Sequence, residues 1–148
     1  MEDEIKKLVS EVLRDGFVIN LATNDKDGPW AASLVYVFDE EFNIYWISVP
    51  SSRHSRAIEK DKKVACAIVA EYATDKERAL QIEGIAAPFP KTPFELEKKL
   101  QKKRGMSMPE KAGVSLKNKY QWYRLQPTRI ELMYNERFGY ERKSLLLN

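Results

Sequence analysis

The chain contains one cysteine and one histidine, and it lacks any long hydrophobic run. The single cysteine, Cys66, cannot form an internal disulfide, and its apolar neighbours in "VACAIV" predict a buried thiol. One histidine and one cysteine far apart in sequence do not make a metal site, so we expect none. No segment reaches the roughly 20 apolar residues that a membrane helix needs. These absences favour a reducing compartment, and we expect a cytoplasmic protein without a membrane partner.

Positive charge exceeds negative charge only slightly in this chain. The formal net charge is +3, which neither requires nor excludes nucleic acid. Residues 98–119 form a basic region that is most simply a solvated surface, with a phosphate-rich ligand or nucleic acid as the functional alternative. No aromatic side chain interleaves with these lysines as a base-stacking platform would. The pattern therefore argues against nucleic-acid binding.

Short apolar runs separated by tight polar turns make up most of the chain. Their spacing favours an antiparallel barrel or sandwich over alternating βαβ units, so we expect a mainly β protein with some helix (α+β). We expect a single domain over residues 1–148, since no repeat or linker interrupts the pattern. The candidate strands are residues 17–23, 30–39, 43–49, 62–72, 77–89, 120–127 and 128–135, with Pro127 dividing the last two.

Two helices are predicted outside these strands. Apolar residues at helical spacing near the start of the chain predict a helix that ends at Asp15–Gly16. A second helix is predicted over residues 92–104, where Thr92 can cap, Pro93 takes the first helical position and Glu95 completes a capping box. A polar loop over residues 106–119 follows it.

The stretch "PSSRHSRAIEKD", residues 50–61, concentrates hydroxyls and positive charge between two candidate strands. Ser51 or Ser52 can cap a short helix whose first N–H groups and dipole favour an anion. Arg53 and Arg56 can add forked, charge-assisted hydrogen bonds to phosphate oxygens. The alternative is a capped surface helix whose arginines are solvated.

Three motifs in a fixed order carry a resemblance to a known family. They are "GPWAASLVYVFDEEFNIYWISVPSSRHSRAIEKDKKVACAIV", then "LQIEGIA", then "YRLQPTRIELMYNERFGYERKSLL". Together they resemble the pyridoxamine 5′-phosphate oxidase-like superfamily of FMN-binding split barrels, in particular a branch with Arg-His at the phosphate step. The resemblance implies an antiparallel six-stranded split β-barrel with flanking helices, and FMN as the cofactor.

The resemblance also implies which residues hold the cofactor. They comprise a strand beside the flavin ring, the end of an aromatic-rich strand near the ribityl and phosphate, the phosphate step itself, and a glutamine on the fifth strand. At the phosphate step a histidine replaces the usual lysine, and histidine is neutral above roughly pH 6.5 unless an anion raises its pKa. The implied cofactor-binding residues are Ser33, Leu34, Val35, Ile47, Ser48, Ser52, Arg53, His54 and Gln81.

The substrate half of the oxidase site has no counterpart in this sequence. The helix over 92–104 lacks the Tyr and Ser that the oxidase uses there, and no histidine follows His54 to form its Arg-x-His motif. We therefore expect an FMN-dependent oxidoreductase of unknown substrate and unknown catalytic residues, not a true pyridoxamine phosphate oxidase. The alternatives are a non-enzymatic module for flavin, haem or another small ligand, and a deazaflavin-dependent reductase.

The resemblance further implies a homodimer, because split barrels of this superfamily place each flavin between two subunits. The apolar runs "LVYVF" and "IYWISV" exceed what one core of this size needs to bury, which agrees with an apolar interface. Their aromatic residues could also form a flavin pocket, although core or dimer packing is the commoner use of such a pattern. These aromatics are Trp30, Tyr36, Phe38, Tyr45 and Trp46.

Overall fold

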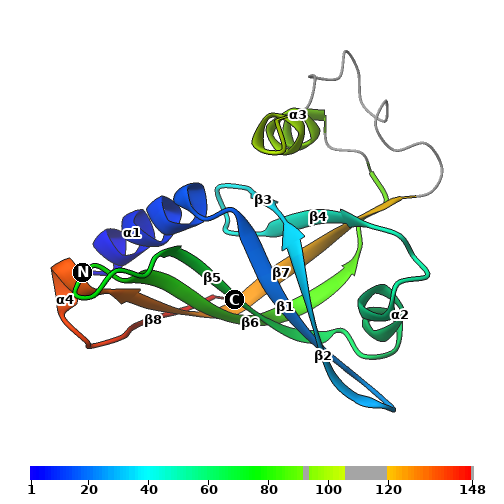
Figure 1. Ribbon diagram of the computed structural model, residues 1–148, viewed down its shortest axis with the longest axis horizontal. Coiled ribbons are helices and arrows are strands. Elements are labelled where there is room, and N and C mark those ends of the chain that lie inside the picture. Colours follow the sequence, from blue (N-terminus) through cyan, green and yellow to red (C-terminus); the bar gives the residue numbers. More distant parts are fainter. Residues whose placement is uncertain (92–93, 106–119, 148) are drawn as a thin grey trace.

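The computed structural model describes residues 1–91, 94–105 and 120–147, which form one antiparallel sheet and four helices. The strands are β1 (Val18–Asp25), β2 (Gly28–Val35), β3 (Val37–Phe38), β4 (Ile44–Ser48), β5 (Lys63–Glu71), β6 (Arg78–Pro88), β7 (Gln121–Tyr134) and β8 (Lys143–Leu146). The helices are α1 (Glu2–Asp15), α2 (Arg53–Lys60), α3 (Phe94–Lys103) and α4 (Asn135–Phe138). Helices α1 and α2 lie at opposite ends of the curled sheet (Figure 1).

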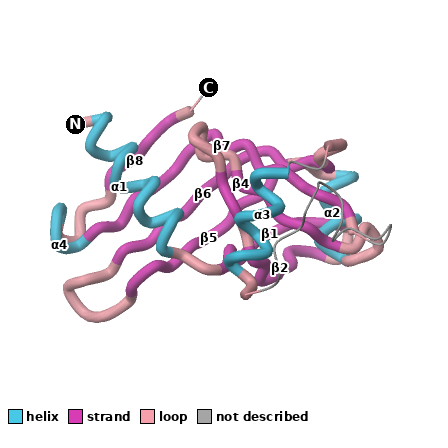
Figure 2. The backbone as a smooth tube through the Cα atoms, turned by 90° about the horizontal axis from the view of Figure 1, so that it is seen from above, coloured by secondary structure: helices cyan, strands magenta, loops and turns pink. Residues whose placement is uncertain are grey.

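The sheet is curled, and its two outermost strands are consecutive in the chain. Its order is β2-β1-β5-β6-β7-β4-β3, with β8 paired to β7, so β2 and β3 are the two ends. These ends are joined in the chain by Tyr36 alone, whose fully buried side chain donates a hydrogen bond to the carbonyl oxygen of Leu13 at 2.5 Å. The resulting half-barrel confirms the predicted mainly β, antiparallel class with flanking helices (Figure 2).

The described residues form eight strands, where six were expected. One cause is the break at Tyr36, which divides the predicted run 30–39 into β2 and β3. Another is β8, a short strand in the C-terminal segment that pairs with Arg129–Leu132. Both additions lie at sheet margins, where a short strand gives little alternation for a sequence pattern to detect.

The division of the last two predicted strands at Pro127 is wrong, because β7 runs unbroken through it. Gly84 pairs with Pro127 and Glu83 with Arg129, which leaves Thr128 as an extra residue and makes a β-bulge. A bulge tolerates proline because no ladder hydrogen bond from its nitrogen is required. Gly84 permits the close crossing, since a Cβ there would lie 2.3 Å from the carbonyl oxygen of Gln126.

Alternation along the strands directs one face of the sheet into the core. Ile19 and Leu21 of β1, Ile68 of β5 and Leu132 of β7 are fully buried, and the apolar residues of α1 belong to the same core. Cys66 lies in the same core as a free thiol, as its sequence context predicts. A second cluster packs beneath α3 and contains Val37, Tyr45, Leu100 and Trp122.

The predicted helices are confirmed where the structure describes them. The first ends at Asp15 with Gly16 at its C-cap, and the second spans Phe94–Lys103. The predicted cap residues Thr92 and Pro93 and the predicted polar loop 106–119 lie outside the described residues. None of the described helices has the length and apolar character needed to cross a membrane.

Candidate functional site

The first turn of α2 is the centre of the predicted phosphate site. Ser52 occupies the N-cap position, but its side chain makes no capping hydrogen bond to the helix. Its Oγ lies instead 2.8 Å from the carbonyl oxygen of Val49 and 2.8 Å from Oγ of Ser55. The amides that begin the helix are therefore not capped by Ser52, and the positive end of the helix dipole points at the same place.

His54 points from this turn into the protein. Its Nε2 lies 2.8 Å from Oγ of Ser48 and 3.4 Å from Oγ of Ser52. Ser55, fully buried, continues the chain of polar groups to the phenol of Tyr123. Burial lowers the pKa of His54 below its ordinary value, so the imidazole is neutral at physiological pH. Ser48, Ser52 and His54 thus come together, as a buried network that anchors α2.

Arg53 points the opposite way, toward the turn between β1 and β2. Its Nε donates to Oδ2 of Asp25 at 3.1 Å and its Nη2 donates to Oδ1 at 3.3 Å. Its guanidinium carbon lies 4.4 Å from the ring centroid of Trp30, which is the geometry of a cation–π contact. The Arg53 hydrogen bond, followed by one from the amide of Asp27, lowers the pKa of Asp25. Arg53, the side chain predicted to bind the phosphate, is therefore already in contact with a carboxylate and an aromatic ring.

A cavity of about 520 Å³ separates the turn between β1 and β2 from α2. Arg53 and Arg56 lie on its wall together with Lys26 and Lys60, which gives it four positive side chains. Four carboxylates balance them; they belong to Asp25, Asp27, Glu59 and Asp61. Because the two signs are balanced, any preference for an anion depends on which of these cations is released from its carboxylate.

The residues predicted to line the flavin ring lie on the edge strand β2. Its other side carries no paired strand in the sheet order, so alternate backbone N–H and C=O groups of Ser33, Leu34 and Val35 face outward. The Ser33 side chain is exposed and donates to Oδ1 of Asn20 at 2.8 Å. Leu34 packs on the main core, while Val35 and Ile47 pack on the smaller cluster beneath α3. The side chains of Leu34, Val35 and Ile47 therefore serve packing, and the backbone of β2 is open to contact a ring.

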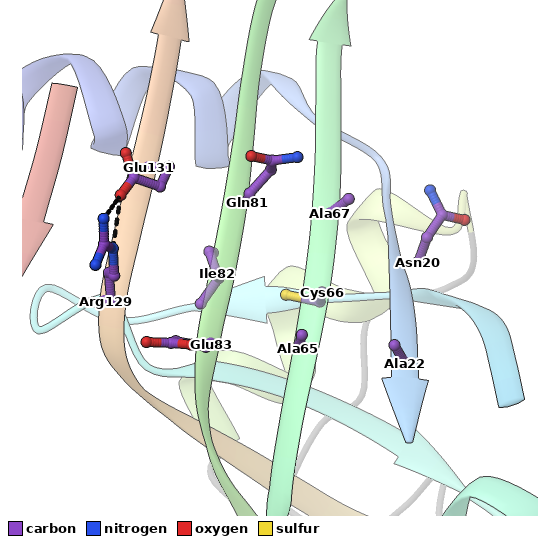
Figure 3. A pocket seen from close by; sticks show the side chains of 10 residues that line it. All are labelled: Asn20, Ala22, Ala65, Cys66, Ala67, Gln81, Ile82, Glu83, Arg129 and Glu131. Atoms are coloured by element: carbon purple, nitrogen blue, oxygen red, sulfur yellow. Dashed lines mark hydrogen bonds and ion pairs between the residues drawn. The ribbon is translucent and has the colours of Figure 1, made fainter. Parts of the chain in front are cut away.

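Gln81 lies apart from these groups, on the outer face of the sheet. It lines a shallow pocket of about 370 Å³ formed over β1, β5, β6 and β7. Asn20, Ala67 and Gln81 occupy one row across three neighbouring strands (Figure 3). An ion pair borders the pocket, in which Nε of Arg129 donates to Oε1 of Glu131 at 2.6 Å. In this chain the fifth-strand glutamine and the phosphate step therefore line different cavities.

Lys103, from the predicted basic region, takes a role that its sequence context did not indicate. Its Nζ donates to the carbonyl oxygen of Tyr36 at 2.8 Å and lies 3.5 Å from the centroid of that ring. Burial lowers its pKa to about 8. It lines a cavity of about 640 Å³ between α1, β3 and α3, and there it ties α3 to the residue that joins the two ends of the sheet. The remaining part of the basic region, beyond Gly105, lies outside the described residues.

Sequence reasoning missed Asp25 as a part of this site. The turn "NDKDGP" carries only a turn signal, and its aspartates are typical of such turns. Asp25 does make the expected local bond, since the amide of Asp27 donates to its Oδ1 at 2.8 Å. The contact with Arg53 depends on how the sheet brings that turn against α2, which no local pattern reports.

Comparison with known proteins identifies the fold. No family model and no curated protein sequence matches the chain, whereas solved structures do. General stress protein 26 from Bacillus anthracis strain Sterne matches with a TM-score of 0.71 and 16% identity, over 97% of this chain and 99% of its own. An F420 reductase matches with a TM-score of 0.64 and 19% identity, over 82% of this chain and 94% of its own.

A haem protein has the same architecture. HutZ, the haem storage protein from Vibrio cholerae, matches with a TM-score of 0.60 and 16% identity, over 93% of this chain and 91% of its own. The chain therefore has the split-barrel fold found in these proteins, and the fold that the sequence resemblance implies is confirmed. At these identities the likeness establishes the fold, and the ligand must be argued from the site.

Proposed function

We propose that the chain binds FMN, with the flavin phosphate at the first turn of α2. The observation that carries the proposal is the combination of uncapped amides at the start of an eight-residue helix with a guanidinium, that of Arg53, on its first residue. Uncapped helix amides and a forked guanidinium are both suited to a phosphate. The open side of β2 offers backbone donors and acceptors for the polar edge of a flavin ring.

Bound FMN would supply hydride chemistry, and the protein would position the flavin and exclude competing reactions. We propose an FMN-dependent oxidoreductase on this basis. No side chain of the described site stands out as an acid or base, because His54 is held against Ser48 and Asp25 against Arg53. A saturable electron acceptor, found by steady-state kinetics with reduced FMN on the protein, would distinguish an enzyme from a flavin-storing module.

Haem is the second candidate, since one neighbour in fold is a haem storage protein. Haem iron is usually held by a histidine or a cysteine thiolate, with methionine and tyrosine as further options. The one histidine of this chain is turned into the protein, and burial raises the pKa of the Cys66 thiol to about 12. Neither of these two side chains is therefore presented to a haem iron, which would need a methionine or tyrosine instead. A deazaflavin would use the same phosphate contacts, so mass spectrometry of the released cofactor is needed to separate it from FMN.

We also propose that the working form is a homodimer. The outer face around Gln81 presents alanines, namely Ala22, Ala65 and Ala67, flanked by the exposed side chains of Val69 and Ile85. Small exposed residues around a shallow pocket leave room for close contact with a second sheet. A flavin between two copies would also allow Gln81 of one and Ser33 of the other to belong to one site. Sedimentation showing a folded monomer at micromolar concentration would contradict this arrangement.

The phosphate contact can be tested with one variant and two ligands. In Arg53→Ala, FMN affinity should fall by about tenfold or more, because a charge-assisted hydrogen bond contributes roughly 1.5–3 kcal/mol. Riboflavin lacks the phosphate, so its weaker binding should change little. Quenching of flavin fluorescence measures both affinities. Lys102→Ala is the control, since Lys102 is exposed on α3, and it should leave both unchanged.

Equal losses of FMN and riboflavin in Arg53→Ala would show that the arginine supports the local structure and not the phosphate. In that case the start of α2 is a surface helix, and the ligand of the barrel is something else. The absorption spectrum of the purified protein is the first measurement to make, because a bound flavin and a bound haem have distinct bands.

A further inference from the structure

The guanidinium of Arg53 is already forked onto another anion. Its Nε and Nη2 both donate to the carboxylate of Asp25, at 3.1 and 3.3 Å. The same Nε–Nη2 edge is the one that grips phosphate in a two-pronged contact. Trp30 covers the flat face of the group at 4.4 Å. In this arrangement a phosphate could reach only the remaining donors of Arg53.

Asp25 is held in place to make this contact. It ends β1, and the amide of Asp27 donates to its Oδ1 at 2.8 Å across a two-residue turn. Gly28 closes that turn with a φ of 106°, a conformation that residues with a side chain rarely adopt. The hydrogen bonds from Arg53 and Asp27 lower the pKa of Asp25, so the carboxylate stays ionised. It therefore offers Arg53 a permanent, pre-positioned negative charge.

We infer that Asp25 competes with the phosphate group of the ligand for Arg53, so that the turn between β1 and β2 must release Arg53 before the phosphate is fully held. This inference rests on the proposed phosphate site at α2. A doubly charged phosphate can displace a carboxylate from a guanidinium, whereas a singly charged group gains little by the exchange. Asp25 would thus set a threshold that favours doubly charged phosphate esters over carboxylates, and it would weaken FMN binding without affecting uncharged flavin.

The variant Asp25→Asn shows whether Asp25 competes with the phosphate for Arg53 or instead holds Arg53 in position to bind it. Asparagine keeps an oxygen that can accept from the amide of Asp27, and it removes the charge that holds Arg53. FMN affinity should rise by about threefold to tenfold, because the ion pair no longer opposes the phosphate. Riboflavin affinity should stay the same. Fluorescence titrations at one fixed ionic strength give both values.

Two further variants make the test specific. Asp27→Asn removes the same charge from the same turn, but the Asp27 side chain is exposed and the forked hydrogen bonds of Arg53 go to Asp25, so it should raise FMN affinity much less. In an Arg53→Ala background the effect of Asp25→Asn should disappear, since nothing remains to compete for. The double-mutant cycle measures this coupling directly.

The possible results are distinct. Wild-type FMN binding with an unchanged or lowered affinity in Asp25→Asn overturns the inference alone, and a lowered affinity would mean that Asp25 orients Arg53 for the ligand. An equal gain in Asp27→Asn, or a gain that persists without Arg53, also overturns it, because the effect would then be one of general charge. If neither the wild type nor Asp25→Asn binds FMN, the proposed phosphate site fails and the inference fails with it.

Discussion

Arg53 and His54 are adjacent in sequence, yet they contact two different regions of the molecule. His54 enters a buried network in which its ring lies beside the hydroxyl groups of Ser48 and Ser52. Arg53 enters a partly buried cluster with Asp25 and Trp30 on the other side of the same helical turn. A helix rotates about 100° per residue, so one turn can place neighbours on opposite faces. The inner face fixes where α2 lies, and the outer face is left to meet a ligand.

The comparison predicts very different costs for removing each residue. His54→Ala should lower the free energy of unfolding by about 2–4 kcal/mol, since it leaves a cavity and an unpaired buried hydroxyl on Ser48. Arg53→Ala should leave stability nearly unchanged, because partly exposed ion pairs contribute little. Urea denaturation of both variants measures the difference. Similar losses would mean that the two faces of the turn are not distinct in role.

A smaller effect is expected on the pH dependence of stability, where His54 contributes through the burial of its ring. The pKa of His54 is lowered on folding, so below about pH 6.5 the unfolded chain binds a proton that the folded protein does not. The stability associated with His54 is therefore complete above that pH and declines as the pH falls through 6.5 toward 5, by at most about 1.4 kcal/mol per pH unit.

His54→Gln isolates this effect, because glutamine can hydrogen-bond to Ser48 but cannot titrate. The wild type should unfold with a larger free energy than His54→Gln at pH 7.5, and this difference should shrink as the pH falls to 5. Since this chain has one histidine, no other imidazole contributes to the difference. Parallel stability curves for the two proteins would show that the pKa of His54 is the same in the folded and the unfolded state.

The fold could be predicted from sequence because it depends on repeated, local signals. Alternation along runs such as 62–72 indicates a strand with one buried face, and Cys66 falls on that face as expected. The effect of Pro127 could not be predicted in the same way. Whether a proline ends a strand depends on whether its nitrogen faces a partner, and here the bulge opposite Gly84 removes that requirement.

The site could be predicted only in part, for a related reason. The residue types at 52–54 indicate an anion-binding step, but side-chain direction at the start of a short helix depends on what the helix packs against. Ser48 and Tyr123 bind the inner side of α2 and so decide that His54 turns inward. The partner of Arg53 lies on a distant turn, and only the curvature of the sheet brings Asp25 within reach.

The unbroken β7 has a consequence for how the chain acquires its structure. Residues Gln121–Leu125 pair with β4, Arg129–Leu132 pair with β8, and nearly the whole length pairs with β6. The hairpins β1–β2, β3–β4 and β5–β6 can form as each emerges during synthesis, but β4 has no place in the sheet until the last third of the chain is made. Such long-range pairing is slow to form and leaves strand edges exposed meanwhile. The edge of β4 that pairs with β7 therefore stays open to wrong partners until β7 has been made.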